Sequence, residues 1–297
     1  MELSLGPGSA FGIGTPDGLE SYARAAAGAG FAGLSLAAHG LPSDLGEAAA
    51  ILERHGLRCT DLLNLTVTRD EDATLAAARA LRPAVDALGP DAVNTLVWTR
   101  VSEQSLDRLG RVADLLGVPL ALEFSPGPVA TLDAALDLAQ ALGPRRATVL
   151  ADTFHFFRAG STWAMLENAP VDRIGIVQFS DGLPSRSQDY MTETVNRRAW
   201  PGDGEFPLQQ FVATLRDRGW DGVVSVEVLS ERLRDLPVAE FARLAHRTAA
   251  AGRARPVARV GNAQGLGAAP REARLVDRIR LAARRSRSPG AADDVPR

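Results

Sequence analysis

Apolar runs with β-strand character alternate with Ala-, Leu- and Arg-rich stretches along the first 250 residues of the chain. The runs have the length of buried strands, and the stretches between them repeat apolar residues at helical spacing. The eight strands expected are 2–5, 33–37, 58–64, 92–98, 119–124, 147–152, 174–180 and 222–229. The helices expected are 16–29, 43–55, 71–88, 102–116, 131–142, 161–168, 207–218 and 238–250.

This alternation predicts the fold class. Eight strands and eight helices indicate an α/β protein with a (β/α)8 TIM barrel, because right-handed β-α-β units close on themselves at that number. An open doubly wound sheet is the rival arrangement. It is disfavoured because no GxGxxG sequence follows the first strand, and GPGSAFG at 6–12 is only a glycine-rich turn. We expect the catalytic barrel to span residues 1–252.

The end of the chain differs in charge from the rest. The whole chain has a net charge of −3, yet residues 251–297 hold eleven Arg against four Asp or Glu. We expect residues 253–297 to form a basic, partly disordered C-terminal extension, with an amphipathic helix in REARLVDRIRLAARR. The remaining, acidic body is a poor surface for nucleic acid, so no nucleic-acid partner is expected.

Other classes of protein are excluded by what the sequence lacks. It has no apolar stretch long enough for a membrane span and no secretory signal, so we expect a cytoplasmic protein without a membrane partner. It contains no lysine, which excludes pyridoxal phosphate attachment and a P-loop lysine. We therefore expect neither a pyridoxal phosphate nor a nucleotide cofactor. The oligomeric state, including an oligomer of identical chains, stays open.

Acidic and amide side chains occupy the predicted ends of strands five to eight, namely Glu123, Asp152, Gln178 and Glu227. Reactive groups of a TIM barrel sit at these strand ends. Three carboxylates brought together would raise one another's pKa unless a cation neutralised them. We therefore predict a divalent-metal site with these four ligands. Oxygen donors favour Mg²⁺ or Mn²⁺, with Co²⁺ as a further candidate.

A purely structural explanation is open for each of these residues. Asp152 could cap the helix that follows it, and Glu123 and Glu227 could pair with arginines. His155, three residues after Asp152, could be an ordinary histidine at a helix start.

Five short motifs at these places resemble those of one family: LEF at 122–124, DTFH at 152–155, QFSD at 178–181, RAWPGDG at 198–204 and SVE at 225–227. Over about residues 1–250 the chain resembles the xylose-isomerase-like superfamily of TIM barrels, often labelled sugar phosphate isomerase/epimerase. That superfamily includes keto-sugar 3-epimerases, hydroxypyruvate isomerases, inosose dehydratases, 3-dehydroshikimate dehydratases and endonuclease IV. Its motifs are specific for the superfamily but not for the substrate.

The resemblance implies Glu123, Asp152, Gln178 and Glu227 as metal ligands, with His155 and Arg198 contacting substrate oxygens. One residue departs from the pattern. Most epimerase relatives have a His where this chain has Gln178, and a Gln there resembles some bacterial dehydroshikimate dehydratases. The carbonyl oxygen of a Gln can still bind a metal ion.

Such a site suits removal of a proton next to a carbonyl. Glu227 or Glu123 would remove the proton from a metal-bound, sugar-like polyhydroxy ketone, and its return elsewhere makes the enzyme an isomerase or epimerase. If a β-hydroxyl leaves instead, the enzyme is a dehydratase, for which His155 could protonate the leaving group. A non-catalytic sugar-binding barrel also stays open because of Gln178. A DNA-repair endonuclease is disfavoured, since four His are too few for a multi-zinc cluster.

A connection of about 25 residues, 182–206, follows strand seven and predicts a lid over the site. Trp98, at the end of strand four, and Trp200, in the lid, are expected to contact the substrate. Phe11 could supply a further apolar wall. The arginines expected in the lid are Arg186, Arg197 and Arg198.

Overall fold

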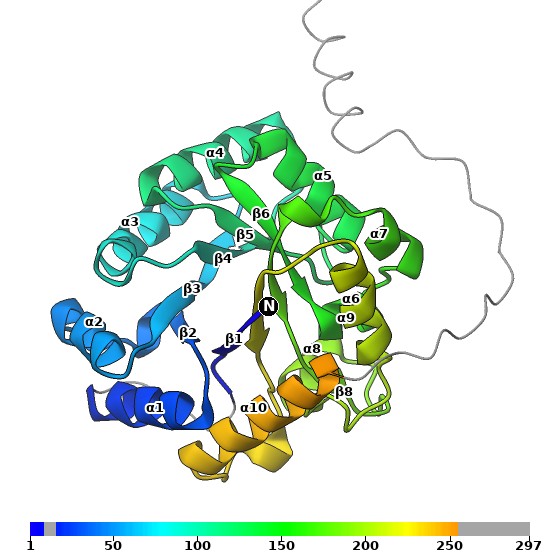
Figure 1. Ribbon diagram of the computed structural model, residues 1–297. Helices are drawn as coiled ribbons and strands as arrows, with labels where there is room; N and C mark the ends of the chain where they lie inside the picture. Colours follow the sequence, from blue (N-terminus) through cyan, green and yellow to red (C-terminus); the bar gives the residue numbers. More distant parts are fainter. Residues whose placement is uncertain (9–15, 255–297) are drawn as a thin grey trace, which may run out of the picture.

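The computed structural model of the chain describes residues 1–8 and 16–254. Within them, parallel strands close into a barrel in the order β1-β10-β7-β6-β5-β4-β3-β2, with the helices around it (Figure 1). The predicted TIM barrel is confirmed, and each strand end lies within three residues of its predicted position. The barrel strands are β1 (Glu2–Leu5), β2 (Gly33–Ala37), β3 (Arg58–Val67), β4 (Ala92–Val97), β5 (Leu120–Glu123), β6 (Ala147–Asp152), β7 (Ile174–Gln178) and β10 (Val223–Val226).

Helices follow the strands and cover the outside of the barrel (Figure 1). They are α1 (Pro16–Ala29), α2 (Leu45–Arg54), α3 (Glu71–Leu88), α4 (Glu103–Leu116), α5 (Leu132–Leu142), α6 (Thr153–Arg158), α7 (Trp163–Asn168), α9 (Leu208–Asp217) and α10 (Val238–Ala254), with short 3-10 helices η1 (Ala38–Gly40), η2 (Val171–Arg173) and η3 (Glu231–Leu233). Two α-helices were not predicted. The prediction placed a single short helix at 161–168, whereas the structure has α6 before it, and α8 (Tyr190–Asn196) lies in the connection predicted as a lid. Within the described residues, no helix combines the length and apolar composition needed to cross a membrane.

Local sequence signals explain where the helices begin and end. Ser102 and Ser105 form a capping box at the start of α4, and the Asp70 side chain accepts a hydrogen bond from the first turn of α3. Gly89 and Gly117 end α3 and α4 with φ of 56° and 73°, a conformation that glycine adopts without steric cost. The helix lengths therefore follow from residues at their ends as well as from apolar spacing.

Two predictions fall outside the described residues. The basic extension lies there from residue 255 onward, including its amphipathic helix. Phe11 lies there as well.

A buried carboxyl group in β3 belongs to the polar part of the barrel. Asp61 has no exposed surface, and it accepts hydrogen bonds from Ser35 Oγ at 2.7 Å and from Thr60 Oγ1 at 2.9 Å. Burial raises the pKa of Asp61 to about 6, against the opposing effect of these two hydrogen bonds. Asp61 therefore holds its proton more tightly in the folded chain than in the unfolded one.

This shift predicts a pH dependence of stability. The pKa of Asp61 is raised on folding, so the contribution of Asp61 to the free energy of unfolding falls as pH increases from about 4 to about 6. The total fall is roughly 3 kcal/mol. In Asp61→Asn, the difference in unfolding free energy between pH 4 and pH 7 should change by about that amount. Urea unfolding of the metal-free protein at both pH values measures it. An unchanged pH dependence would show that Asp61 titrates normally.

The connection between β7 and α9 contains the predicted lid. Its first strand, β8 (Asp181–Gly182), pairs antiparallel with β9 (Arg198–Ala199), and α8 (Tyr190–Asn196) lies between them along the chain. This segment returns to the barrel at β10, since Arg198 N donates to Leu229 O at 3.0 Å.

Asp181 explains the QFSD and PGDG motifs. Its carboxylate accepts hydrogen bonds from Gly202 N at 3.1 Å and from Phe206 N at 2.9 Å. A Cβ on Gly204 would lie 2.3 Å from Asp181 Oδ1, so a side chain there would displace this carboxylate. The two motifs thus form one structural unit. The hydrogen bonds of Asp181 fix the turn after β9, and Arg198 is part of β9.

Candidate active site

The four predicted ligands lie at the carboxyl ends of adjacent strands. Glu123 ends β5, Asp152 ends β6, Gln178 ends β7, and Glu227 directly follows β10. The pairing register sets Asp152 beside Gln178, and Gln178 beside Ser225 of β10. Each of the four has at most 8% of its surface exposed. The structure therefore gathers these side chains in one buried region.

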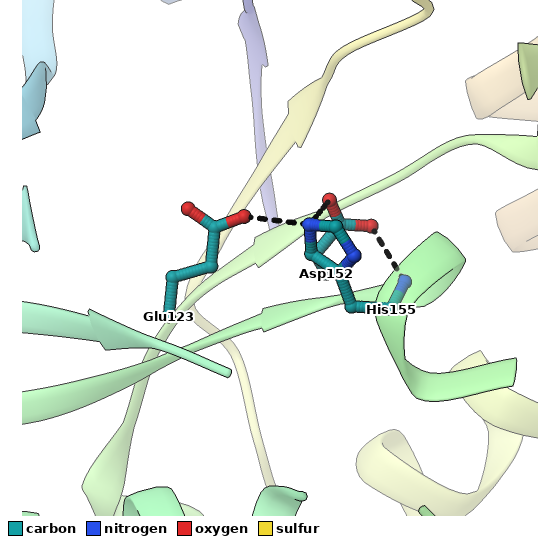
Figure 2. A group of neighbouring side chains, drawn as sticks. All are labelled: Glu123, Asp152 and His155. Carbon is teal, nitrogen blue, oxygen red and sulfur yellow. Dashed lines mark hydrogen bonds and ion pairs between the residues drawn. The ribbon is translucent and has the colours of Figure 1, made fainter. Parts of the chain in front are cut away.

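Three donor groups converge most closely, as Figure 2 shows: Glu123 from β5, Asp152 from the end of β6 and His155 from α6. His155 Nε2 lies 3.0 Å from Glu123 Oε1 and 3.5 Å from Asp152 Oδ2. One ligand atom from each residue lies within 4.8 Å of the others. This arrangement suits a divalent metal ion. It adds His155 to the candidate metal ligands, whereas the sequence analysis assigned His155 to the substrate.

Arg198 is placed against the carboxylates by the lid. Its Nη1 donates to Asp152 Oδ2 at 2.8 Å and lies 3.6 Å from Glu227 Oε2. Only 2% of Arg198 is exposed, and Thr194 accepts two further hydrogen bonds from its guanidinium group. Arg198 is thus held by both the barrel and α8, as a fixed charge between two carboxylates.

Asp152 has both of the functions that the sequence left as alternatives. Its Oδ1 accepts from Phe154 N at 2.6 Å and from His155 N at 3.4 Å, so it caps α6. Burial by itself would raise the pKa of Asp152, but Arg198 and His155 hold it below its usual value. Capping and ion pairing therefore keep an ionised carboxylate at the end of β6, ready to bind a cation.

Glu227 is in a different electrostatic environment. Burial raises the pKa of Glu227 to about 8, and the nearby carboxylates of Asp152 and Glu123 add to the effect while Arg198 opposes it. A carboxylate with a raised pKa is a stronger base than an exposed one. The site thus contains one carboxyl group with a lowered pKa, Asp152, and one with a raised pKa, Glu227.

The side-chain oxygen of Gln178 lacks a hydrogen-bond partner among the described residues. This atom, Oε1, is buried. A buried amide oxygen without a partner carries an energetic penalty, which a bound cation would remove. The donor set of two carboxylates, an imidazole and this amide oxygen fits a divalent ion.

These groups line a pocket of about 190 Å³. Of the residues described above, Glu123, His155, Gln178, Arg198 and Glu227 line it. Trp98 lies at its edge with 52% of its surface exposed, in the place the sequence predicted for a substrate contact. The other lining residues are Asn64, Asn94, Leu96, Ser125, Pro126, Tyr190, Met191, Thr194, Val195 and Leu229.

Three side chains of the lid lie outside this pocket. Trp200 is buried and packs edge-on against Phe241 with ring centroids 4.8 Å apart, and it does not line this pocket. Arg197 pairs with Glu193 at 3.2 Å and donates to Pro184 O, so it holds the lid together. Arg186 is exposed and outside the lining as well. Side chains in a long connection take positions set by distant contacts, which periodicity does not reveal.

Two functional residues were missed by the sequence reasoning. Asn94 in β4 donates to Glu123 Oε2 at 2.9 Å, which orients that carboxylate. Tyr190, the first residue of α8, hydrogen-bonds His155 Nδ1 through its hydroxyl group and stacks on the imidazole at 5.7 Å between centroids. The polar position of Asn94 inside a predicted strand was a signal that could have been used. No local pattern marked Tyr190.

Tyr190→Phe should lower catalysed proton exchange by roughly 10- to 100-fold, because His155 would lose the hydrogen bond that sets its ring orientation and tautomer. The phenyl ring keeps the stacking contact, so the melting temperature should change little. Exchange rates and melting curves of the two proteins measure both effects. Wild-type exchange in this variant would show that Tyr190 does not position His155.

The comparisons with known proteins agree with this geometry. A model of the xylose isomerase-like TIM barrel family matches residues 23–249. The chain belongs to this family. An inosose isomerase of Halalkalibacterium halodurans is 31% identical over 148 residues, which cover 48% of this chain and 51% of that protein. A 3-dehydroshikimate dehydratase of Pseudomonas putida is 28% identical over 94 residues, 32% of this chain and 15% of that protein.

The chain spans about half the length of the inosose isomerases it matches. Both kinds of relative are named as enzymes, an isomerase and a dehydratase. The IOLI protein, solved with a binding zinc atom, superposes with a TM-score of 0.75 at 20% identity, over 85% of this chain and 98% of that one. At this identity the likeness shows a common fold.

Proposed function

We propose that this chain is a divalent-metal-dependent isomerase or epimerase that removes a proton next to the carbonyl of a sugar-like polyhydroxy ketone. The observation that carries the proposal is the pair of buried glutamates, Glu123 and Glu227, lining one pocket with different electrostatic environments. Enzymes that move a proton within a substrate need one group to accept it and one to return it. Similarity to inosose isomerases supports a polyhydroxy ketone as substrate.

Glu227 is the better base of the two. Asn94 and His155 contact the carboxylate of Glu123. Within the described residues, the one polar contact of the Glu227 carboxylate is with Arg198, at 3.6 Å. We therefore assign proton removal to Glu227. Glu123 and His155, whose side chains lie 3.0 Å apart, would return the proton. Arg198 keeps Asp152 ionised and donates toward substrate oxygens from the pocket wall.

Glu123 and Asp152 would hold the metal ion, with Gln178 Oε1 as a further oxygen donor and His155 or Glu227 in the remaining position. When bound, such an ion supplies Lewis-acid stabilisation of the negative charge that develops on the substrate oxygen. Mn²⁺ and Mg²⁺ suit the oxygen donors, and Co²⁺ is a further candidate. The zinc atom of the IOLI protein adds Zn²⁺ to the ions that need testing.

The test is exchange of substrate protons in D₂O. Full-length protein loaded with each of these four ions is incubated with keto-sugars, inososes and 3-dehydroshikimate, and products are followed by NMR and mass spectrometry. Deuterium uptake at the carbon next to the carbonyl, with a new isomer or epimer, is the expected result. Metal-loaded protein that binds these ketones without any exchange would instead be a sugar-binding barrel.

A dehydratase is the second candidate, favoured by Gln178 and by the partial match to a 3-dehydroshikimate dehydratase. The same proton removal would then be followed by loss of a hydroxyl group, protonated by His155. The same experiment separates the two, because a dehydratase product is lighter by one water molecule.

A further inference from the structure

The described lining of the pocket contains one arginine, and that arginine is already paired. Among the described residues that line it, Arg198 is the only Arg, and Asp152 accepts its hydrogen bond at 2.8 Å. Segment 9–15, SAFGIGT, carries no ionisable side chain. Phosphate and carboxylate groups are usually bound by unpaired arginines or by clusters of backbone N–H groups. The described pocket wall offers no unpaired Arg for this purpose.

The charges in the site leave no positive excess. The carboxyl groups of Glu123, Asp152 and Glu227 outnumber the one guanidinium group beside them, that of Arg198. A phosphate or carboxylate group on the substrate would then be buried beside carboxyl groups without a free counter-charge, which costs several kcal/mol. The residues of the site therefore disfavour an anionic ligand.

Two arginines outside the lining, one from α6 and one from the lid, are engaged in ion pairs. Arg158 pairs with Glu205 at 2.6 Å and donates to Leu183 O. Arg197 pairs with Glu193 inside the lid. Neither guanidinium is left free to turn toward the pocket without breaking an ion pair.

The mouth of the pocket is apolar. Trp98, Met191 and Val195 have 52%, 55% and 38% of their surface exposed, and they are the large apolar side chains that stand out as exposed in the described chain. All three line this one pocket. We call them the apolar rim. Trp98 comes from the end of β4, and the other two come from α8 of the lid. The end of a ligand that points away from the buried carboxylates would therefore meet carbon atoms.

We propose that the substrate is an uncharged polyhydroxy ketone, without phosphate or carboxylate, and that the apolar rim contacts its carbon skeleton. The inference rests on the proposed function, because it takes the ketone end to lie beside the buried carboxylates. Exposed apolar side chains gathered at a pocket mouth are typical of a ligand contact or of an interface. Their shared position on this pocket favours the ligand.

Matched pairs of ligands test the charge. Binding of a keto-hexose and its phosphate ester, and of 3-dehydroshikimate and its methyl ester, is measured by calorimetry on the full-length protein, metal-free and metal-loaded. The uncharged member of each pair should bind at least about tenfold more tightly. Tighter or equal binding of the charged member, or binding of neither, would overturn the inference. If the uncharged members bind but never exchange protons, the proposed function fails and the inference stands.

Rim variants test the contact. Val195→Arg adds a cation at the pocket mouth, and the ratio of affinities should shift toward the phosphate ester by about tenfold relative to the matched uncharged variant Val195→Gln. Met191→Gln should weaken binding of the uncharged ketone. Sedimentation of the same variants covers the other explanation: a change from oligomer to monomer with unchanged affinities would assign the rim to an interface and overturn its role in binding.

Discussion

Glu227→Gln should lower the rate of proton exchange by about 10³-fold, the largest loss expected from any single substitution in this site. The amide has nearly the same shape as the carboxylate but cannot accept a proton from carbon. Glu227 can act as a base only when it is ionised. Its raised pKa of about 8 therefore also predicts that, in the metal-free site, the ionised fraction of Glu227 increases as pH rises towards and beyond 8. A bound cation moves that pKa downward.

The fold of this variant should remain intact. The pKa of Glu227 is raised on folding, so its contribution to stability falls as pH increases from about 4.5 to about 8. Glu227→Gln removes this loss, and the metal-free variant should be at least as stable as the wild type at pH 8. Exchange rates by NMR and unfolding curves at pH 5 and pH 8 measure both effects. Substantial exchange in a well-folded Glu227→Gln protein would refute its role as base.

Asp152→Asn should have the largest effect on stability and on metal binding. Asp152 is fully buried, and its loss of charge leaves the buried guanidinium of Arg198 with only Glu227 beside it, at 3.6 Å. Removing one partner of a buried ion pair destabilises by roughly 3 kcal/mol or more. The amide is also a weaker metal ligand, so the affinity for divalent ions should fall by about 100-fold.

A matched control separates capping from charge. Asp44 caps α2 through Gly46 N and Glu47 N, much as Asp152 caps α6, but it is exposed and does not line the pocket. Asp44→Asn should cost less than about 1 kcal/mol and leave metal affinity unchanged. Metal titrations and urea unfolding of both variants provide the comparison. Equal effects of the two substitutions would reduce Asp152 to a helix cap.

The double role of Asp152 shows how far sequence reasoning could reach. Its place after the apolar run ATVL predicted a strand end, and the residue types around it predicted either a cap or a ligand. Both interpretations were chemically sound. They do not exclude each other, because one carboxylate oxygen accepts the backbone N–H groups of α6 while the other faces Arg198.

The sequence by itself determined the barrel and the strand-end positions of Glu123, Asp152, Gln178 and Glu227. Apolar periodicity and chain order are local properties, and a closed parallel barrel then gathers the carboxyl ends of its strands in one place.

Only the tertiary structure decided the contacts made by the lid. Arg198 meets Asp152 across 46 residues and Tyr190 meets His155 across 35, while Trp200 turns to Phe241 instead of the substrate pocket. Such contacts depend on where a long connection folds back, which is set by packing between distant residues rather than by any repeating pattern along the chain.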